Sequence, residues 1–252
     1  MSNLDEISEK IKNHYDLYPL DFLTKEDEKN IEKIQGPFKQ FTDRYISKNH
    51  KIVNIGCGPG RAEMFLTKYG YDITGVDVSK TTLKLAKKRA PKANFIIGDN
   101  SNLPFPDQSF DVVISDGVIH HTVDPKKSFI ENMRILKKGG FLYLGIYRKF
   151  SYYHIIYRYV GKPIRLIEKN FIGKYIINLT LIPLYYLVHF IKSGGTRKFL
   201  GAKNFFYDYI ITPKASFISK KEILTWSSKV NLKLVEYISK YGNTQIFIFE
   251  KF

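Results

Sequence analysis

The sequence predicts an α/β fold with a doubly wound, mostly parallel sheet. Short apolar runs alternate with amphipathic segments of helical length between residues 51 and 147. Parallel strands need long crossover connections of this kind, and these crossovers are right-handed. The first run ends in a glycine-rich turn, and the next three end at or beside Asp77, Asp99 and Asp116. These groups should meet at the carboxyl edge of the sheet, where ligands bind in such folds.

Two helices are predicted before the first strand. Residues 4–18 carry apolar side chains at helical spacing, and Pro19 stops the pattern. Residues 26–47 predict a second helix that leads directly into the first strand. The aromatic residues near the end of the first helix are Tyr15, Tyr18 and Phe22. Packing under a surface helix is the ordinary role for each of them.

The first strand, Val53-Asn54-Ile55, runs into the loop Gly56-Cys57-Gly58-Pro59-Gly60. Glycine reaches backbone conformations with positive φ and lets a ligand lie against the main chain. The helix that starts at Arg61 presents its unpaired N–H groups to the same place. The loop is therefore the predicted floor of a ligand site, although purely structural strand-to-helix turns have similar sequences.

The remaining core elements follow from local signals. Gly70 suits the C-terminal cap of a helix from Arg61 to Tyr69, and Ser79 suits the N-cap of a helix to Arg89. Asp124-Pro125 opens a helix that runs to about Leu136. The predicted second to fifth strands cover residues 72–77, 95–100, 110–116 and 141–147. A capping box at Ser219-Lys220-Lys221-Glu222 starts a last helix, and strands over residues 232–238 and 245–249 follow.

These residues resemble the class I S-adenosylmethionine-dependent methyltransferases, within them the small-molecule group typified by ubiquinone/menaquinone-type enzymes. The matching pieces appear in the expected order between residue 51 and about residue 147. They are the loop at 56–60, then residues 75–79, 98–99, 103–105, 109–113, 120–125 and 136–140. The resemblance implies a seven-stranded Rossmann-like sheet whose last two strands form an antiparallel hairpin.

The resemblance also divides the chain into four parts. Residues 1–50 are expected to form an N-terminal helical lid segment, to which Tyr15, Tyr18 and Phe22 would contribute. Residues 51–147 form the cofactor-binding core. Residues 148–215, between strand five and the last helix, form a helical and aromatic lid for the acceptor. Residues 216–252 complete the core with a helix and a hairpin.

The implied cofactor is S-adenosyl-L-methionine, and the product is S-adenosyl-L-homocysteine. The resemblance assigns Asp99 to the adenine amino group, Asn100 or Ser101 to a ring nitrogen, Asp77 to the ribose hydroxyls and Val78 to one face of the ring. The expected cofactor-binding residues are Gly56, Cys57, Gly58, Gly60, Asp77, Val78, Asp99, Asn100, Ser101, Asp116 and His121. Asp77 and Asp99 as plain helix caps are the alternative.

The glycine spacing supports this cofactor over a dinucleotide. A dinucleotide site favours G-x-G-x-x-G, whose third glycine allows close helix packing. Here Arg61 occupies that position, and Gly60 comes one residue early. S-adenosylmethionine has no phosphate, and its methionine carboxylate can occupy the N–H groups at the helix end. Nicotinamide and flavin cofactors are therefore not expected.

The segment from Ser115 to His121 should lie where the sulfonium meets the acceptor. Asp116 or nearby carbonyls suit the methionine amino group, and alignment of the acceptor can supply most of the acceleration. If the acceptor is a hydroxyl, His120 or His121 is the candidate base, with a structural role as the alternative. Ser115-Asp116-Gly117-Val118 lacks the pattern of base-modifying amino-methyltransferases, so a nucleic-acid acceptor is not expected.

The insertion at 148–215 is rich in tyrosine and phenylalanine, as lids over apolar acceptors are. Its uncharged run at 175–191 is short for a membrane span, and we expect a buried lid helix. The flanking basic residues instead suit a helix lying on an anionic bilayer. These residues are Lys169, Lys174, Lys192, Arg197 and Lys198. Peripheral membrane contact over 169–198 is thus the second interpretation.

Composition limits the function classes. The net charge is +16, but the excess is local, since Glu168 is the only acid between residues 148 and 203. One cysteine excludes an internal disulfide and a cysteine-cluster metal site, and no metal is expected. The first residues lack the layout of a secretion signal, so a cytoplasmic location is expected. Oligomeric state and the atom that receives the methyl group stay open.

Three functions follow from these observations. The leading hypothesis is a methyltransferase for a small organic acceptor with an apolar or aromatic part. A second hypothesis keeps the chemistry but makes the acceptor a lipid or quinone reached from the membrane surface. The third is a non-catalytic protein that binds S-adenosylmethionine for regulation or assembly.

Overall fold

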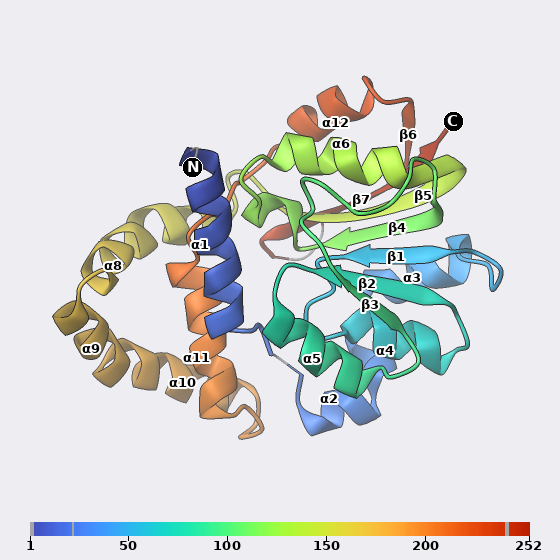
Figure 1. Cartoon of the computed structure of the whole chain (residues 1–252). Helices are drawn as coiled ribbons and strands as arrows, with labels where there is room; N and C mark the ends of the chain where they lie inside the picture. Colours follow the sequence, from blue (N-terminus) through green and yellow to red (C-terminus); the bar gives the residue numbers. More distant parts are fainter. Residues whose placement is uncertain (1–2, 22, 240–241) are drawn as a thin grey trace.

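A computed structural model describes residues 3–21, 23–239 and 242–252. Its centre is a seven-stranded sheet in the order β3-β2-β1-β4-β5-β7-β6 (Figure 1). The strands are β1 (Ile52–Ile55), β2 (Ile73–Asp77), β3 (Asn94–Ile97), β4 (Phe110–Asp116), β5 (Leu136–Tyr147), β6 (Leu232–Ile238) and β7 (Thr244–Lys251). Strands β1 to β5 pair in parallel, and β7 runs antiparallel to both β5 and β6. The predicted fold class, an α/β doubly wound sheet, is confirmed.

Helices cover both faces of the sheet, as a parallel sheet requires. On one face α6 (Pro125–Ile135) and α12 (Lys220–Ser227) pack Phe129, Met133 and Ile223 against β7. On the other face α3 (Pro37–Tyr45) and α4 (Arg61–Lys68) pack phenylalanine rings against Tyr143 of β5. The helix α5 (Lys80–Arg89) contacts α4, β2 and β3. All four residues of β1 are buried between these layers.

The predicted helix starts are capped as the sequence indicates. Ser79 accepts a hydrogen bond from the Thr82 N–H at 3.1 Å and begins α5. Asp124 accepts from two N–H groups at the start of α6. Ser219 and Glu222 form a reciprocal capping box at the start of α12. Side-chain caps of this kind satisfy the unpaired N–H groups of the first turn, which explains why these boundaries are readable from sequence.

The single helix predicted over residues 26–47 is wrong. The structure has α2 (Lys25–Lys29), the 3-10 turn η1 (Ile31–Ile34) and then α3. Gly36, with φ of 50°, breaks the helical path, and Pro37 then starts α3 at a position that needs no N–H donor. The turn η1 and the helix α3 pack with α4 on one face of the sheet. The helix α1 (Asn3–Leu17) lies beside α5.

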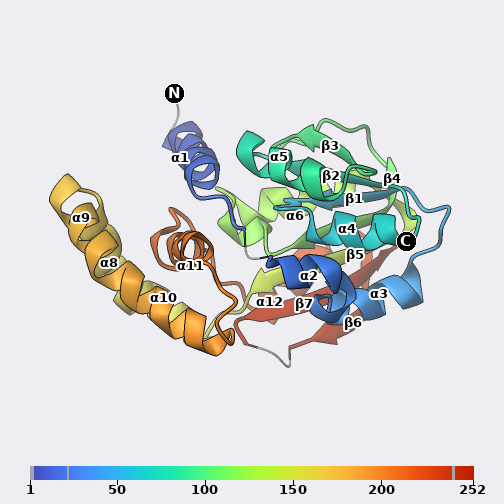
Figure 2. The same ribbon diagram turned by 90° about the horizontal axis from the view of Figure 1, so that it is seen from below.

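The insertion after β5 is built from helices with a small core of their own. These are α7 (Tyr152–Ile155), the π-helical turn η3 (Ile156–Val160), α8 (Gly161–Glu168), α9 (Phe171–Leu179), α10 (Leu181–Lys192), α11 (Phe199–Phe206) and the π-helical turn η4 (Tyr207–Ile211). Ile177 and Ile182 pack on Phe206, Tyr207 and Ile210. Figure 2 shows α8, α9 and α10 in a row, with α1 and α11 between that row and the sheet.

The expectation of a buried lid helix over residues 175–191 is wrong. Of the described helices, only the run Phe171–Lys192 is long and apolar enough to cross a membrane, and 17% of its most apolar window is buried. Its inner stripe, Gly173, Ile177 and Ile182, is buried against the rest of the insertion. The opposite side of α9 and α10 is apolar too, but it lies in solvent, because no other described element covers it.

Glu63 of α4 is a buried acid behind the glycine loop. Its side chain is fully buried, Oε1 accepts from the Asn54 amide at 2.9 Å, and Oε2 has no hydrogen-bond partner. Burial raises the pKa of this carboxyl to about 7, against the opposing effect of the Asn54 hydrogen bond. The folded protein therefore holds a proton on Glu63 at pH values where the unfolded chain has lost it.

The first prediction concerns Glu63→Gln. Because the folded pKa lies above the unfolded one, the free energy of unfolding falls as pH rises between about 4.5 and 7. Glutamine cannot ionise, so the variant should escape this loss and gain up to about 3 kcal/mol over the wild type at pH 8, relative to pH 4.5. Urea unfolding at both pH values measures the difference. Glu9→Gln, at an exposed site, is the control, and a Glu63→Gln effect independent of pH would contradict the assignment.

Candidate active site

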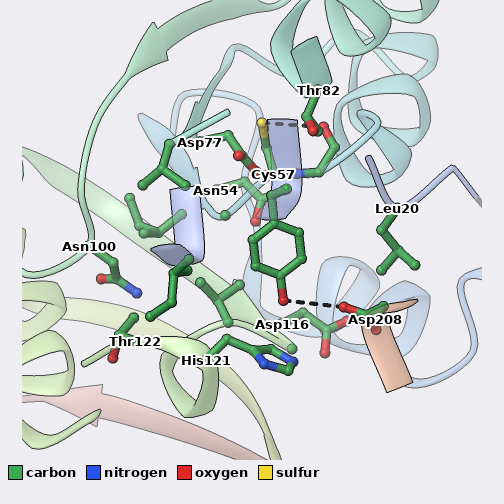
Figure 3. Close-up of a pocket in the computed structure, with 18 of the residues that line it drawn as sticks. Leu20, Asn54, Cys57, Asp77, Thr82, Asn100, Asp116, His121, Thr122 and Asp208 are labelled. Carbon is green, nitrogen blue, oxygen red and sulfur yellow. Dashed lines mark hydrogen bonds between the residues drawn. The ribbon is translucent and has the colours of Figure 1, made fainter. Parts of the chain in front are cut away.

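A cavity of about 680 Å³ lies at the carboxyl edge of the sheet. Figure 3 shows side chains from the glycine loop, the ends of β2 and β4, and the insertion around it. The predicted residues that line it are Gly56, Cys57, Gly58, Asp77, Val78, Asp99, Asn100, Ser101, Asp116 and His121. Gly60 and His120, also predicted, are not among its lining residues. The strand order brings these groups together, because β1 lies between β2 and β4.

The three glycines of the loop have different roles. Gly56 has φ of 68°, and a Cβ there would lie 2.4 Å from the Val118 side chain. Gly58 has φ of 54°, and a Cβ there would meet nothing within 4 Å, so its open face belongs to the cavity. Gly60, with φ of 85°, faces Ala86 of α5 instead. A side chain at Gly60 would thus meet α5, and the expected cofactor contact of Gly60 stays a prediction.

Asp77 ties the end of β2 to the glycine loop. Oδ2 accepts from the Gly58 N–H at 3.0 Å, and Oδ1 accepts from the Ser79 N–H at 2.9 Å. Burial raises the pKa of Asp77, and these backbone hydrogen bonds oppose that rise. Each carboxylate oxygen keeps further acceptor capacity, because an ionised carboxylate accepts about four hydrogen bonds. The cavity side of Asp77 can thus accept donors from a ligand.

The residues after β3 include an unpaired buried amide. Asp99 Oδ1 accepts from the Ser101 N–H at 2.7 Å, and Oδ2 accepts from the Ser8 hydroxyl of α1 at 3.4 Å. Asn100 is buried, and neither its amide nitrogen nor its amide oxygen has a hydrogen-bond partner. Buried polar groups are nearly always paired. Since Asn100 lines the cavity, a ligand with a donor and an acceptor is the natural partner.

Arg61 and Asp116 form an ion pair in the cavity wall. Their closest N···O distance is 2.8 Å, and Arg61 also donates to Gln35 at 3.1 Å. Both side chains are partly exposed to the cavity. The sequence predicts Arg61 as the start of the helix after the loop, in the place of a third glycine, and predicts no role for its side chain. Its position directly after the loop, at the first turn of α4, was the available signal for a functional role.

The two histidines of the 120–121 pair differ. His120 is fully buried, accepts from the Tyr147 N–H at 3.3 Å and stacks on the Tyr147 ring. Burial lowers its pKa well below the usual value, so the ring stays neutral. His121 lines the cavity, with Nδ1 2.7 Å from the Lys214 carbonyl. A carbonyl only accepts, so Nδ1 carries the proton, and in a neutral ring Nε2 then has the lone pair.

The insertion places an acid opposite His121. Asp208 of η4 lines the cavity and accepts a hydrogen bond from the Tyr15 hydroxyl of α1 at 3.2 Å (Figure 3). Burial raises the pKa of Asp208, while His121 and the Tyr15 hydroxyl oppose the rise. The Tyr15 ring meets the His121 ring edge-on at 6.0 Å. Sequence reasoning missed Asp208 as a site residue, because only tertiary packing brings the insertion to this edge.

Of the other proposed lid aromatics, Tyr18 is described and does not line the cavity. Tyr18 stacks on Tyr207 with ring centroids 3.7 Å apart. Phe22 lies outside the described residues. The apolar part of the lining comes instead from Ile11, Leu20, Phe38, Tyr147, Phe205 and Tyr209. The cavity therefore combines polar groups from the strand ends with apolar and aromatic side chains, several of them from α1, α3 and the insertion.

Comparison with known proteins agrees with this geometry. Residues 53–144 match the family model described as a methyltransferase domain. A demethylmenaquinone methyltransferase of Paenarthrobacter aurescens is 34% identical over 95 residues, which is 38% of each chain. A ubiquinone/menaquinone biosynthesis C-methyltransferase of Campylobacter jejuni is 26% identical over 82% of this chain and 81% of that one.

Among solved structures, a methyltransferase from Methanosarcina mazei described as SAM-dependent has the same fold. Its TM-score is 0.55 at 20% identity, over 84% of this chain and 96% of that one. The match to the Paenarthrobacter protein spans well under half of that relative's length. The family model covers the chain from β1 into β5, the part that contributes the strand ends at the cavity.

The second prediction tests the contact between α1 and the insertion. Tyr15→Phe removes the hydroxyl that donates to the buried carboxyl of Asp208. Leaving that group short of a donor should lower the free energy of unfolding by about 1–3 kcal/mol, measured in urea. Tyr175→Phe, at an exposed tyrosine of α9, should have little effect. Equal stability of wild type and Tyr15→Phe would mean that this contact does not hold α1 in place.

Proposed function

We propose that the protein transfers a methyl group from S-adenosylmethionine to a small organic acceptor, and the match of residues 53–144 to a methyltransferase domain supports this proposal. The observation that carries this proposal is the buried, unpaired amide of Asn100, set beside Asp77 and Asp99 on the cavity wall. A nucleoside offers donors and acceptors that match these groups. The apolar and aromatic side chains of the cavity suit an acceptor with an apolar or aromatic part.

The sheet edge supplies the groups for the nucleoside in this proposal. Asp77 accepts from the ribose hydroxyls, and the open face of Gly58 leaves room for the ribose against the backbone. Asp99 and Asn100 pair with the edge of the adenine ring, and Val78 covers one face of it. The bound cofactor supplies a methyl group on a positively charged sulfur. The protein's part is to bind, orient and exclude water.

The Arg61–Asp116 pair suits the methionine end of the cofactor. That end carries one carboxylate and one ammonium group, and the pair presents one cation and one anion 2.8 Å apart. We assign the carboxylate to Arg61 and the ammonium to Asp116, because opposite charges then face each other at both positions. The N–H groups at the start of α4 favour the same carboxylate.

His121 and Asp208 suit the acceptor. A hydroxyl on the acceptor can donate to Nε2 of His121, whose tautomer is set by the Lys214 carbonyl. Asp208 orients the acceptor from the side of the insertion through the hydrogen-bonded pair with Tyr15. Methyl transfer to an activated carbon gains most from alignment, so these groups act first as positioning groups and His121 also removes the proton. His120 has no part in this proposal, since it is buried behind Tyr147.

The third prediction tests cofactor binding. Calorimetry should show binding of S-adenosylhomocysteine to the wild type, and Asp77→Ala or Asn100→Ala should each weaken it by about tenfold or more, as expected for losing hydrogen bonds of 1–3 kcal/mol. Asp72→Ala, at an exposed acid just before β2, should leave affinity unchanged. Unchanged affinity in folded Asp77→Ala and Asn100→Ala would overturn the nucleoside assignment.

The fourth prediction tests the chemistry. With methyl-labelled S-adenosylmethionine and a fractionated metabolite and lipid extract, the wild type should label one class of small acceptor. His121→Gln should lower kcat by about 10²–10⁴-fold if it removes a proton, while binding of S-adenosylhomocysteine persists. His50→Gln, a surface control outside the cavity, should leave the rate unchanged. Cofactor binding without turnover in any fraction would favour the non-catalytic binding protein instead.

A second candidate function keeps this chemistry and takes a lipid or quinone acceptor from a membrane. The exposed apolar stripe of α9 and α10 favours it, because an enzyme that takes its acceptor from a membrane needs a surface that contacts lipid, whereas one with a water-soluble acceptor does not. The names of the Paenarthrobacter and Campylobacter relatives point to quinone acceptors for those proteins. Labelling confined to the lipid fraction would distinguish this candidate from a water-soluble acceptor.

A further inference from the structure

The helices α9 and α10 carry an apolar surface that nothing in the described chain covers. We call it the outer face, and it consists of Phe171, Ile172, Tyr175, Ile176, Leu179, Leu184, Leu187, Val188, Phe190 and Ile191. These side chains are between 36% and 85% exposed. They recur at helical spacing on the side opposite the buried stripe. The run is thus apolar on both sides, which is unusual for a helix at the surface of a soluble protein.

The buried stripe fixes how the run is held. Ile177 and Ile182 pack on Phe206 and Ile210 of α11 and η4. At Gly173 a Cβ would lie 2.0 Å from the Ile167 carbonyl oxygen, so α8 and α9 approach closely. Because the buried stripe is already packed, the run cannot rotate to bury the outer face without losing these contacts. Large exposed apolar surfaces of this kind mark sites of membrane or protein contact.

The charges around the outer face indicate the partner. Lys169 precedes α9, Lys192 ends α10 and Lys198 precedes α11, and all three are exposed. Arg158 and Lys162 add positive charge on the neighbouring η3 and α8. The only acid of this region, Glu168, is half-buried and lies 3.8 Å from Lys174. An apolar strip with basic ends complements a bilayer with anionic headgroups.

We propose that the outer face docks the protein on an anionic membrane, with α9 and α10 lying in the plane of the headgroups. The run of 22 residues could cross a bilayer by length alone. Crossing would strip Ile177 and Ile182 from α11 and η4, which also bring Phe205, Asp208 and Tyr209 to the cavity. Lying flat keeps that packing and still buries the outer face.

Docking in this way connects the membrane to the acceptor end of the cavity. The outer face and the buried stripe belong to α9 and α10, and the buried stripe packs on α11 and η4, which line the cavity. This consequence rests on the proposed function, whereas the docking itself does not. A docked protein that lacks cofactor binding would separate the two ideas.

Co-sedimentation with vesicles tests the docking. The wild type should bind vesicles of phosphatidylcholine with phosphatidylglycerol at low salt, and bind pure phosphatidylcholine more weakly. Combining Ile176→Gln, Leu187→Gln and Ile191→Gln should reduce binding on the order of tenfold or more. The control combines Ile96→Gln, Ile130→Gln and Val235→Gln, exposed apolar residues of the sheet domain, and should bind as the wild type does. Circular dichroism and urea unfolding confirm that each variant is folded, independently of cofactor binding.

The basic residues have a separate readout. Removing Lys169, Lys192 and Lys198 by substitution to Gln should weaken binding to the anionic vesicles by about fivefold for each lysine. Lys84→Gln, Lys87→Gln and Lys88→Gln on α5 are the matched control. Equal losses in the two triple variants would show that net charge, rather than this surface, attracts the membrane, and would overturn the proposal.

A fluorescent probe keeps the test valid if the glutamine variants do not fold. The native Trp226 packs on Phe129 of α6 and should not respond to vesicles. In Leu187→Trp the added indole should shift its emission to shorter wavelength when anionic vesicles are present. Absence of a shift would overturn the docking surface. Protein that stays on the vesicles after an alkaline wash would indicate a spanning helix instead of docking. A dimer that the outer-face substitutions abolish would show that a second copy of the chain covers this face.

Discussion

The site depends on one contact, the hydrogen bond from the Gly58 N–H to the carboxylate of Asp77 at 3.0 Å. It joins the loop after β1 to the end of β2 and so fixes both walls of the nucleoside end of the cavity. Gly58 has a positive φ, which glycine adopts without strain, and a Cβ there would meet nothing within 4 Å, so the loop stays open on the cavity side. The contact has a cost, because burial raises the pKa of Asp77, and the hydrogen bonds from Gly58 and Ser79 oppose that rise.

Other buried ionisable groups surround this contact. Glu63 lies behind the loop with one unpaired oxygen, and Asp208 lies across the cavity with Tyr15 as its donor. Burial raises the pKa of both carboxyls. The pKa of Asp77 is raised as well, but there two backbone N–H donors oppose the rise, whereas an asparagine amide opposes it at Glu63 and His121 and a tyrosine hydroxyl oppose it at Asp208. Such differences arise from local burial and pairing, and they let neighbouring acids take separate roles.

The insertion has two roles, and it performs them with two layers of helices, α11 and η4 next to the cavity and α9 and α10 outside them. Its inner side closes the cavity through Phe205, Asp208 and Tyr209 and packs α9 and α10 by a narrow stripe. Its outer side presents an apolar surface with basic ends. A helical layer only one helix thick cannot bury both sides against the same domain. The outer face is therefore free to contact something other than the rest of the chain. Its apolar side chains and flanking lysines suit an anionic membrane.

The sequence by itself determined the sheet, the caps and the polar residues at the strand ends, because these depend on short-range signals such as apolar periodicity, glycine conformation and side-chain caps. The tertiary structure alone decided the rest. It broke the 26–47 helix at Gly36, turned Gly60 toward Ala86, buried His120 behind Tyr147 and brought Asp208 opposite His121. It also left the outer face of α9 and α10 in solvent. An apolar run is the same in sequence whether one side or both sides are covered, since coverage depends on neighbours far away in the chain.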